Sequence, residues 1–217
     1  YLVHTPQYVQ ALFPGLIWKM SGNRKEIYLT FDDGPIPEVT PWVLDTLRSF
    51  DAKATFFCVG DNVRKHPEIY DMVSHAGHTV GNHTLNHLSG WATENITYFH
   101  NIRHCSRMVD SGLFRPPYGK LKPSQVQFLQ RHYRIIMWDV LSGDFDRDIR
   151  PEDCAQNVIQ HAEAGSIVVF HDSIKAEANL RHALPMVLEH FTREGYTFQS
   201  LPKLAPAVAE RGLRVAV

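Results

Sequence analysis

Two adjacent carboxylates, Asp32 and Asp33, stand at the abrupt end of a β-prone segment, EIYLTF, at residues 26–31. Strand geometry places neighbouring side chains on opposite sides of the backbone, so the two can have different roles. One can bind a metal ion while the other accepts a proton from metal-bound water, which is the division that metal-assisted hydrolysis requires. The same letters, DDGP, also favour an ordinary turn, and that alternative stays open at this point.

A pair of histidines, His83 and His87, stands four residues apart in GHTVGNHTLNH. On a helical turn both rings would face the same way, close enough to bind one cation, and imidazole suits zinc or a similar transition metal. The chain has 13 histidines, so the pair alone is only moderately specific. His78 lies off the face that the pair shares, and we expect it to pack or to form a hydrogen bond.

Arg115 comes directly before two prolines in FRPPYG. Prolines lock an extended backbone, so the loop that contains Pro116 should hold its shape. A guanidinium on such a loop can orient a carboxylate, and the backbone N–H of Tyr118 can point at a developing oxyanion. A stiff connector with a surface arginine is the competing interpretation.

Ionisable residues also follow two later apolar segments: Asp139 and Asp144 in WDVLSGDF, and His171 and Asp172 in IVVFHD. A histidine tuned by a carboxylate can protonate a departing amine near neutral pH. A structural histidine is the alternative. All four features follow predicted strands, and this common position favours one shared site over four separate coincidences.

Strands and helices are expected to alternate along the chain. Strands are predicted at 26–31 and in KATFFCVG, HTVG, GLFR, YRIIMWDV, GSIVVFHD and YTFQSL, with helices in PEVTPWVLDTLRSF and near 61–76, 93–111, 123–133, 152–164 and 176–193. About seven such strands predict a parallel sheet covered on both faces, either a barrel or an open doubly wound sheet. Because no G-x-G-x-x-G follows a strand, we prefer a distorted barrel, in one domain over 1–217 with its core at about 26–200.

Composition excludes several classes of function. With 22 basic and 23 acidic residues, the net charge of −1 argues against nucleic acid as a partner. The three cysteines form no CxxC pair, and Cys58 lies in an apolar run where a buried, unreactive thiol is expected. No stretch resembles a membrane helix or a secretory leader, but the chain starts at Tyr1, so a removed leader and both a cytoplasmic and a cell-envelope location stay open.

Five motifs together resemble the polysaccharide deacetylases of carbohydrate esterase family 4, which share the NodB homology domain: TFDDGP at 30–35, HTLNH at 83–87, RPPYG at 115–119, WDVLSGDF at 138–145 and IVVFHD at 167–172. The resemblance spans roughly residues 26–200. It implies a distorted (β/α) barrel that holds one divalent metal ion, often zinc, on Asp33, His83 and His87.

The resemblance also implies roles for the other residues. By this analogy Asp32 is the general base, Arg115 holds that base, the Tyr118 backbone stabilises the oxyanion, and His171 is the general acid. Asp144 is then the expected partner of His171, with Asp139 as a weaker candidate.

The fourth motif departs from the family pattern. Leu141 and Phe145 occupy places where the family often has an aspartate and a tryptophan. We expect the apolar wall to be kept, with Phe145 and Pro116 on the substrate side, while the shape of the subsites and the preferred sugar stay open.

The implied function is hydrolysis of acetyl groups from an N-acetylated carbohydrate, such as peptidoglycan or a chitin-like oligomer. This is a hydrolase reaction on a carbon–nitrogen bond other than a peptide bond. Two alternatives stay open: a deacetylase or amidohydrolase for a small or O-acetylated substrate, and a carbohydrate-binding or metal-storing relative without turnover. The sequence leaves the oligomeric state undetermined.

Overall fold

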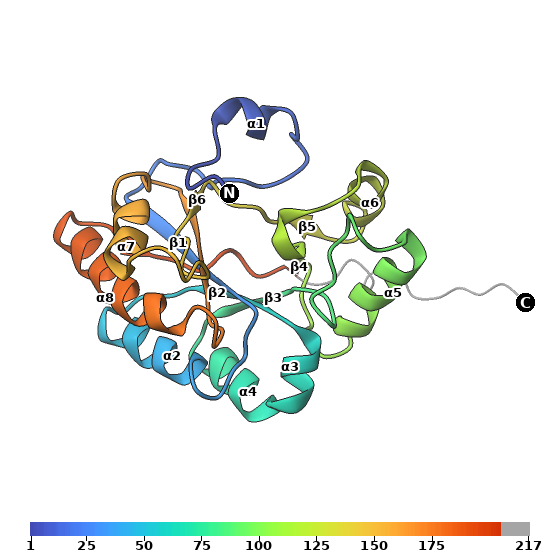
Figure 1. The fold of residues 1–217 in the computed structure, drawn as a ribbon, viewed down its shortest axis with the longest axis horizontal. Helices are drawn as coiled ribbons and strands as arrows, with labels where there is room; N and C mark the ends of the chain where they lie inside the picture. Colours follow the sequence, from blue (N-terminus) through green and yellow to red (C-terminus); the bar gives the residue numbers. More distant parts are fainter. Residues whose placement is uncertain (205–217) are drawn as a thin grey trace, which may run out of the picture.

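The computed structural model describes residues 1–204, and one sheet of eight strands forms its centre (Figure 1). The sheet runs in the order β5 (Arg134–Ile135), β4 (Leu113–Phe114), β3 (Thr79–Asn82), β2 (Thr55–Cys58), β1 (Glu26–Asp32), β7 (Ile167–His171) and β6 (Val140–Leu141), while β8 (Thr197–Phe198) pairs with the start of β1. Every pairing between these strands is parallel. The predicted α/β distorted barrel is confirmed.

The helices cover the outside of this sheet. They are α1 (Gln7–Ala11), α2 (Thr40–Ser49), α3 (Gly60–Lys65), α4 (Pro67–His75), α5 (Asn95–Cys105), α6 (Pro123–Leu129), α7 (Pro151–Ile159) and α8 (Glu177–Arg193), with a short 3₁₀ helix at Pro117–Gly119. In Figure 1, α7, α8, α2 and α4 follow one another around the sheet, and α5 and α6 lie on the side of β4 and β5. In residues 1–204, none of the helices combines the length and the apolar character that crossing a membrane requires.

Alternation along β1 separates the two faces of the sheet. Ile27, Leu29 and Phe31 are fully buried in the cluster that packs against the helices. The residues between them face the other way, and Tyr28 belongs to a separate cluster with residues of β2, β4 and β7. Because strand side chains alternate with a period of two, Asp32 is directed to this inner face at the end of β1.

The carboxyl ends of the strands are in register. Asp32 pairs with His171 of β7 and Phe57 of β2, and Asn82 at the end of β3 pairs with Phe114 at the end of β4. The residues just beyond these ends therefore start from one edge of the sheet, the edge at which parallel α/β folds place their chemistry.

One predicted strand is wrong. YRIIMWDV was expected as a single strand, but its residues form β5 and β6, the two opposite ends of the strand order. Between them the chain pairs with the N-terminal segment instead: Ile17 bonds to both Ile135 and Met137 through its backbone, and Thr5 bonds to Asp139. The run is apolar because it is buried, not because it is one continuous strand.

The helix predicted over 61–76 is also wrong, since it is two helices. The break falls at His66, whose φ of −133° and ψ of 57° are not helical. Pro67 causes it, because a proline disfavours the α conformation in the residue before it and supplies no N–H to the preceding turn. The helix expected at 93–111 is shorter than predicted, and α1 was not predicted at all.

Two smaller expectations are confirmed. Cys58 is buried, and burial raises the pKa of its thiol well above the usual value, as expected of an unreactive cysteine. His78 is buried, and its Nδ1 accepts a hydrogen bond from the backbone N–H of Ala54 at 3.1 Å.

Candidate active site

Arg115 follows β4 and reaches across the inside of the barrel to the end of β1. Its Nη1 donates to Oδ1 of Asp32 at 2.8 Å and to Oγ1 of Thr30 at 2.6 Å. Its other nitrogens donate to two backbone carbonyls, those of Ile136 (3.3 Å) and Met137 (2.9 Å). A fully buried guanidinium needs such partners to offset its lost hydration. The expected contact with Asp32 therefore exists, and it holds one carboxylate oxygen in place.

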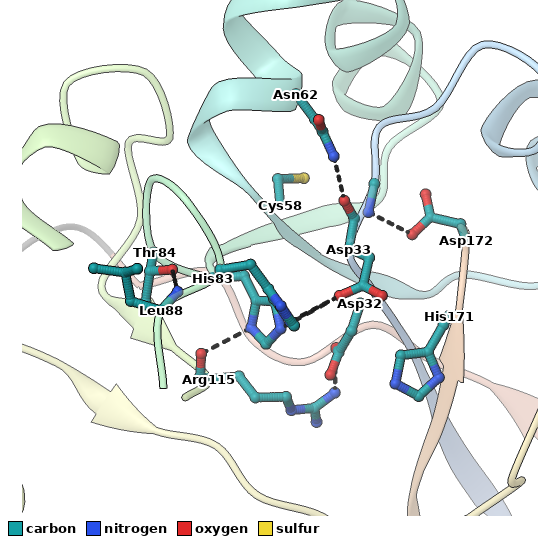
Figure 2. Close-up of polar contacts among 12 residues, drawn as sticks. Asp32, Asp33, Cys58, Asn62, His83, Thr84, Leu88, Arg115, His171 and Asp172 are labelled. Carbon is teal, nitrogen blue, oxygen red and sulfur yellow. Dashed lines mark hydrogen bonds and ion pairs between the residues drawn. The ribbon is translucent and has the colours of Figure 1, made fainter. Parts of the chain in front are cut away.

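Asp33 is directed away from Asp32 by its backbone. Its φ of 85° lies in the left-handed region, and the Asn62 side chain of α3 donates to the Asp33 carbonyl at 2.7 Å (Figure 2). This geometry brings Oδ1 to 3.1 Å from Nε2 of His87 and 3.8 Å from Nε2 of His83. Burial raises the pKa of Asp33, but the neighbouring histidines lower it more, to well below its usual range.

The two histidines do not lie on a helical turn, which corrects that expectation. They lie in a loop after β3, with positive φ at Thr84 (64°) and at His87 (56°). Side chains take the place of helical hydrogen bonds: Oδ1 of Asn101 accepts from the N–H of Leu85 at 2.7 Å. The rings of His83 and His87 still lie close together, with centroids 5.1 Å apart and planes tilted by 49°.

Asp33, His83 and His87 together offer three ligand atoms within 4.8 Å of one another. Nδ1 of His83 lies 2.8 Å from the Arg115 carbonyl oxygen, so Nδ1 carries the proton and Nε2 keeps its lone pair. Burial lowers the pKa of His83 to about 4, which keeps the ring neutral at neutral pH. Oδ1 of Asp33 is buried with no hydrogen-bond partner among residues 1–204. One carboxylate and two imidazoles in this arrangement fit a divalent metal ion.

His171 lies at the end of β7 against Asp144. Its Nδ1 is 2.7 Å from Oδ1 of Asp144, and its backbone N–H donates to Oδ2 at 2.7 Å. Burial lowers the pKa of His171, but the charge and hydrogen bond of Asp144, with help from Asp33 and Asp32, raise it overall to about 9. His171 is therefore protonated at neutral pH, and Figure 2 shows its ring beside Asp32.

Asp139 is not a partner of His171. Its buried carboxylate accepts from Oγ of Ser166 at 2.8 Å and from the N–H of Ile167 at 2.7 Å, at the start of β7 rather than its end. Of the two residues that depart from the fourth motif, Leu141 is buried, and the Phe145 ring lies edge-on to His171 with centroids 5.2 Å apart.

The RPPYG loop places Tyr118 beside the histidine pair. Pro116 has the extended conformation that its sequence predicts, with φ −73° and ψ 133°. Tyr118 has a φ of 61°, and its ring lies 4.8 Å from that of His87. Within residues 1–204 the Tyr118 backbone N–H has no hydrogen-bond acceptor, so it is available to a ligand.

Sequence reasoning gave no role to Asp172 or Asn62. Asp172 is buried; it accepts from the Gly34 N–H at 3.0 Å and from Oγ1 of Thr40 at 2.6 Å, and burial raises its pKa to about 8. A Cβ at Gly34 would overlap the Asp172 carboxylate, so this glycine permits the close approach. Asp172 thus braces the DDGP loop. Its position after an apolar strand was a usable signal, whereas nothing in the sequence marks Asn62.

A family model for polysaccharide deacetylases matches residues 19–133. The chain is 31% identical over 194 residues to a peptidoglycan-N-acetylglucosamine deacetylase of Bacillus cereus, an alignment that covers 86% of this chain and 91% of that protein. The chain belongs to the polysaccharide deacetylase family. A chitooligosaccharide deacetylase of Azorhizobium caulinodans, another member, is 30% identical over 85% of this chain and 96% of its own length.

Solved structures of polysaccharide deacetylases have the same fold. A peptidoglycan N-acetylglucosamine deacetylase in complex with 4-naphthalen-1-yl-N-oxidanyl-benzamide superposes with a TM-score of 0.83 at 28% identity, over 91% of this chain and 95% of that chain. A family 4 pseudoenzyme from Bacillus anthracis gives 0.77 at 25% identity, over 89% and 69%. Family membership confirms the expected enzyme class, a hydrolase of carbon–nitrogen bonds other than peptide bonds.

Proposed function

We propose that this polysaccharide deacetylase is metal-dependent and removes acetyl groups from an N-acetylated amino-sugar glycan, with Asp33, His83 and His87 as metal ligands and with zinc as the metal. The observation that carries the proposal is the convergence of these three side chains between a fixed carboxylate, Asp32, and a protonated histidine, His171. Two imidazoles and one carboxylate form a ligand set that zinc hydrolases use.

A divalent ion held there would polarise the acetyl carbonyl and lower the pKa of a bound water. Asp32 accepts the proton of the attacking water through the oxygen that Arg115 does not hold. Arg115 acts as a positioning residue, because its four hydrogen bonds fix the guanidinium and the one to Oδ1 holds the Asp32 carboxylate in place.

The remaining groups act on the other atoms of the amide. The Tyr118 N–H donates to the oxygen that becomes negative during attack, since it has no acceptor of its own in residues 1–204. His171 donates the proton on Nε2 to the departing nitrogen, while Asp144 holds Nδ1 and stabilises the charged ring. Pro116 and Phe145 limit the space around the acetyl group.

The alternative is a glycan-binding relative without turnover, since the family also contains a pseudoenzyme. Binding alone needs neither a buried carboxylate fixed by an arginine nor a histidine whose pKa is raised to about 9. Both features are costly to bury, and a proton-transfer reaction uses both.

The decisive experiment measures acetate release from chitin oligomers, peptidoglycan and acetylated xylan, before and after a chelator and after zinc is restored. We expect release from the N-acetylated glycans, its loss with chelator and its recovery with zinc. Glycan binding with bound metal but no acetate from any substrate would reject the proposal, and release that a chelator leaves unchanged would reject metal dependence.

A further inference from the structure

The exposed Tyr118 ring lies beside His87, and Lys120 lies near both this ring and a second exposed aromatic ring, that of Trp91. The Tyr118 ring contacts His87, and Nζ of Lys120 lies 5.9 Å from the Tyr118 centroid and 5.5 Å from that of Trp91. Trp91 is 61% exposed, but its Nε1 donates to the Leu121 carbonyl at 2.9 Å, so the ring keeps its place. Tyr118, Trp91 and Lys120 therefore offer two apolar ring faces with a positive charge near both of them.

The same combination recurs beside His171. The Phe145 ring lies edge-on to His171, and Nζ of Lys175 is 5.5 Å from the Phe145 centroid. Lys175 is exposed at the turn between β7 and α8. An aromatic ring therefore lies beside each of the two histidines, His87 and His171, and a lysine lies near each of these rings.

No carboxylate of residues 1–204 lies within 4.0 Å of Nζ of Lys120 or of Lys175. Most lysines of this part of the chain are likewise without an ion pair, Lys19 with Glu163 being the exception, so it is the position of Lys120 and Lys175 next to the site that matters. The whole chain carries a net charge of −1, so these two charges are a local feature and not part of a general positive field. Their position on both sides of one reaction centre suits a substrate with negative groups on both sides of the reacting unit.

We propose that Lys120 and Lys175 bind carboxylates on the substrate, so that this deacetylase prefers an anionic amino-sugar glycan to a neutral one. The inference rests on the proposed function and narrows its substrate class. Aromatic rings contact the sugar faces, and the lysines contact carboxylates on flanking sugars. In peptidoglycan such carboxylates come from the lactyl ether of the sugar itself or from an attached peptide.

The test compares kcat and KM for acetate release from chitin oligomers and from peptidoglycan fragments of equal length, with and without attached peptides. In Lys120→Met and Lys175→Met we expect KM for the charged fragments to rise about two- to fivefold each, the range for exposed ion pairs. Values of kcat, and KM for chitin oligomers, should stay unchanged. Lys120→Arg should keep the low KM, and raising the salt concentration should reduce the preference of the wild type.

Lys25 provides a matched control. It also lies over an aromatic ring, with Nζ 5.4 Å from the Tyr196 centroid, but next to the start of β1, at the edge of the sheet opposite the site. Lys25→Met removes the same charge and the same type of contact, together with a hydrogen bond from Nζ to the Glu194 carbonyl at 2.9 Å, and it should leave both values of KM unchanged.

The outcomes separate this inference from the proposed function. The inference would be wrong if both lysine variants lost activity equally on neutral and charged glycans, or if they lost no activity on either. Acetate release by the wild type would still support the proposed function in both cases. An effect on peptide-free fragments would identify the sugar carboxylate as the ligand; an effect only on peptide-bearing fragments would identify the peptide. If the wild type released no acetate at all, the proposed function would be wrong. The Kd values of the lysine variants for the same fragments would then test whether the lysines bind carboxylates.

Discussion

His83 and His171 lie at the same edge of the sheet, each near a carboxylate, but the structure gives them opposite protonation states at neutral pH. Burial lowers the pKa of His83 to about 4, while the pKa of His171 is raised to about 9. The difference comes from Nδ1: in His83 it faces a neutral carbonyl, that of Arg115, and in His171 it faces the carboxylate of Asp144.

This difference separates a ligand from an acid. A metal ligand must present a lone pair, and a general acid must present a proton. In both histidines the group that contacts Nδ1 determines whether Nε2 presents a lone pair or a proton. The backbone partner suits a site that a cation completes, and the carboxylate partner suits one that donates a proton to nitrogen.

The most severe way to break the comparison is to remove the ligand histidine. His83→Ala should abolish metal binding and lower turnover by more than about 100-fold, beyond the loss typical of outer-shell partners. Elemental analysis of the purified variant measures the metal directly. His75→Ala, at an exposed helix end, is the control and should keep both metal and activity. Stoichiometric metal in His83→Ala would remove His83 from the ligand set.

Removal of the base alone should leave the metal side intact. Asp32→Asn keeps the shape of the side chain but cannot accept a proton, so we expect normal metal content and a loss of kcat of about 10²- to 10⁴-fold. A variant that kept a large fraction of wild-type turnover would show that Asp32 is not the base. Circular dichroism should confirm that the fold tolerates an amide next to the Arg115 guanidinium.

Asp144→Asn should make His171 more like His83. Without the carboxylate, burial should lower the pKa of His171 from about 9 towards neutrality, which NMR of the metal-free protein can follow. A kcat loss of about 10- to 100-fold is expected, with the alkaline limb of the pH profile moved to lower pH.

The same pair makes a prediction for stability. Because the folded state raises the pKa of His171, the pair stabilises the fold fully below about pH 6.5, the unfolded value. That contribution should be lost as pH rises through about 9. Thermal unfolding of the metal-free wild type should show this loss, and Asp144→Asn should lack it. Identical pH dependence in the two proteins would contradict the pairing.

The sequence predicted the fold and the site where the physics is local or repeated. Alternating apolar segments indicated parallel strands, and register then required residues at or just after their ends, such as His171 and Asp33, to meet at one edge. The prediction was wrong at YRIIMWDV, whose apolar residues are buried partly against the N-terminal segment and do not form one strand. The structure of such an apolar segment depends on its tertiary contacts, which the sequence alone does not identify.

The prediction for the histidine pair was correct in position and wrong in cause. A spacing of four predicted a helical turn, but the rings meet through positive φ at Thr84 and His87. The side-chain oxygens of Asn82 and Asn101 support this backbone by accepting from the N–H groups of Thr84 and Leu85. Non-glycine residues with positive φ are uncommon, so spacing alone does not predict this geometry. The role of Asn62 is not predictable from the sequence for the same reason, since it depends on the left-handed backbone of Asp33.

The smallest expected effect on turnover concerns Asp172, the residue after His171. Burial raises its pKa to about 8 with no cation to oppose the shift, so the folded state binds this proton where the unfolded chain has lost it. Its contribution to stability should therefore fall as pH rises from about 4, the unfolded value, to about 8. Asp172→Asn can still accept from Gly34 and contact Thr40 but does not titrate. The variant should match the wild type near pH 4, unfold at a higher temperature near pH 8, and keep most of its kcat. A lower unfolding temperature across that range would mean that Thr40 and Gly34 require the carboxylate itself.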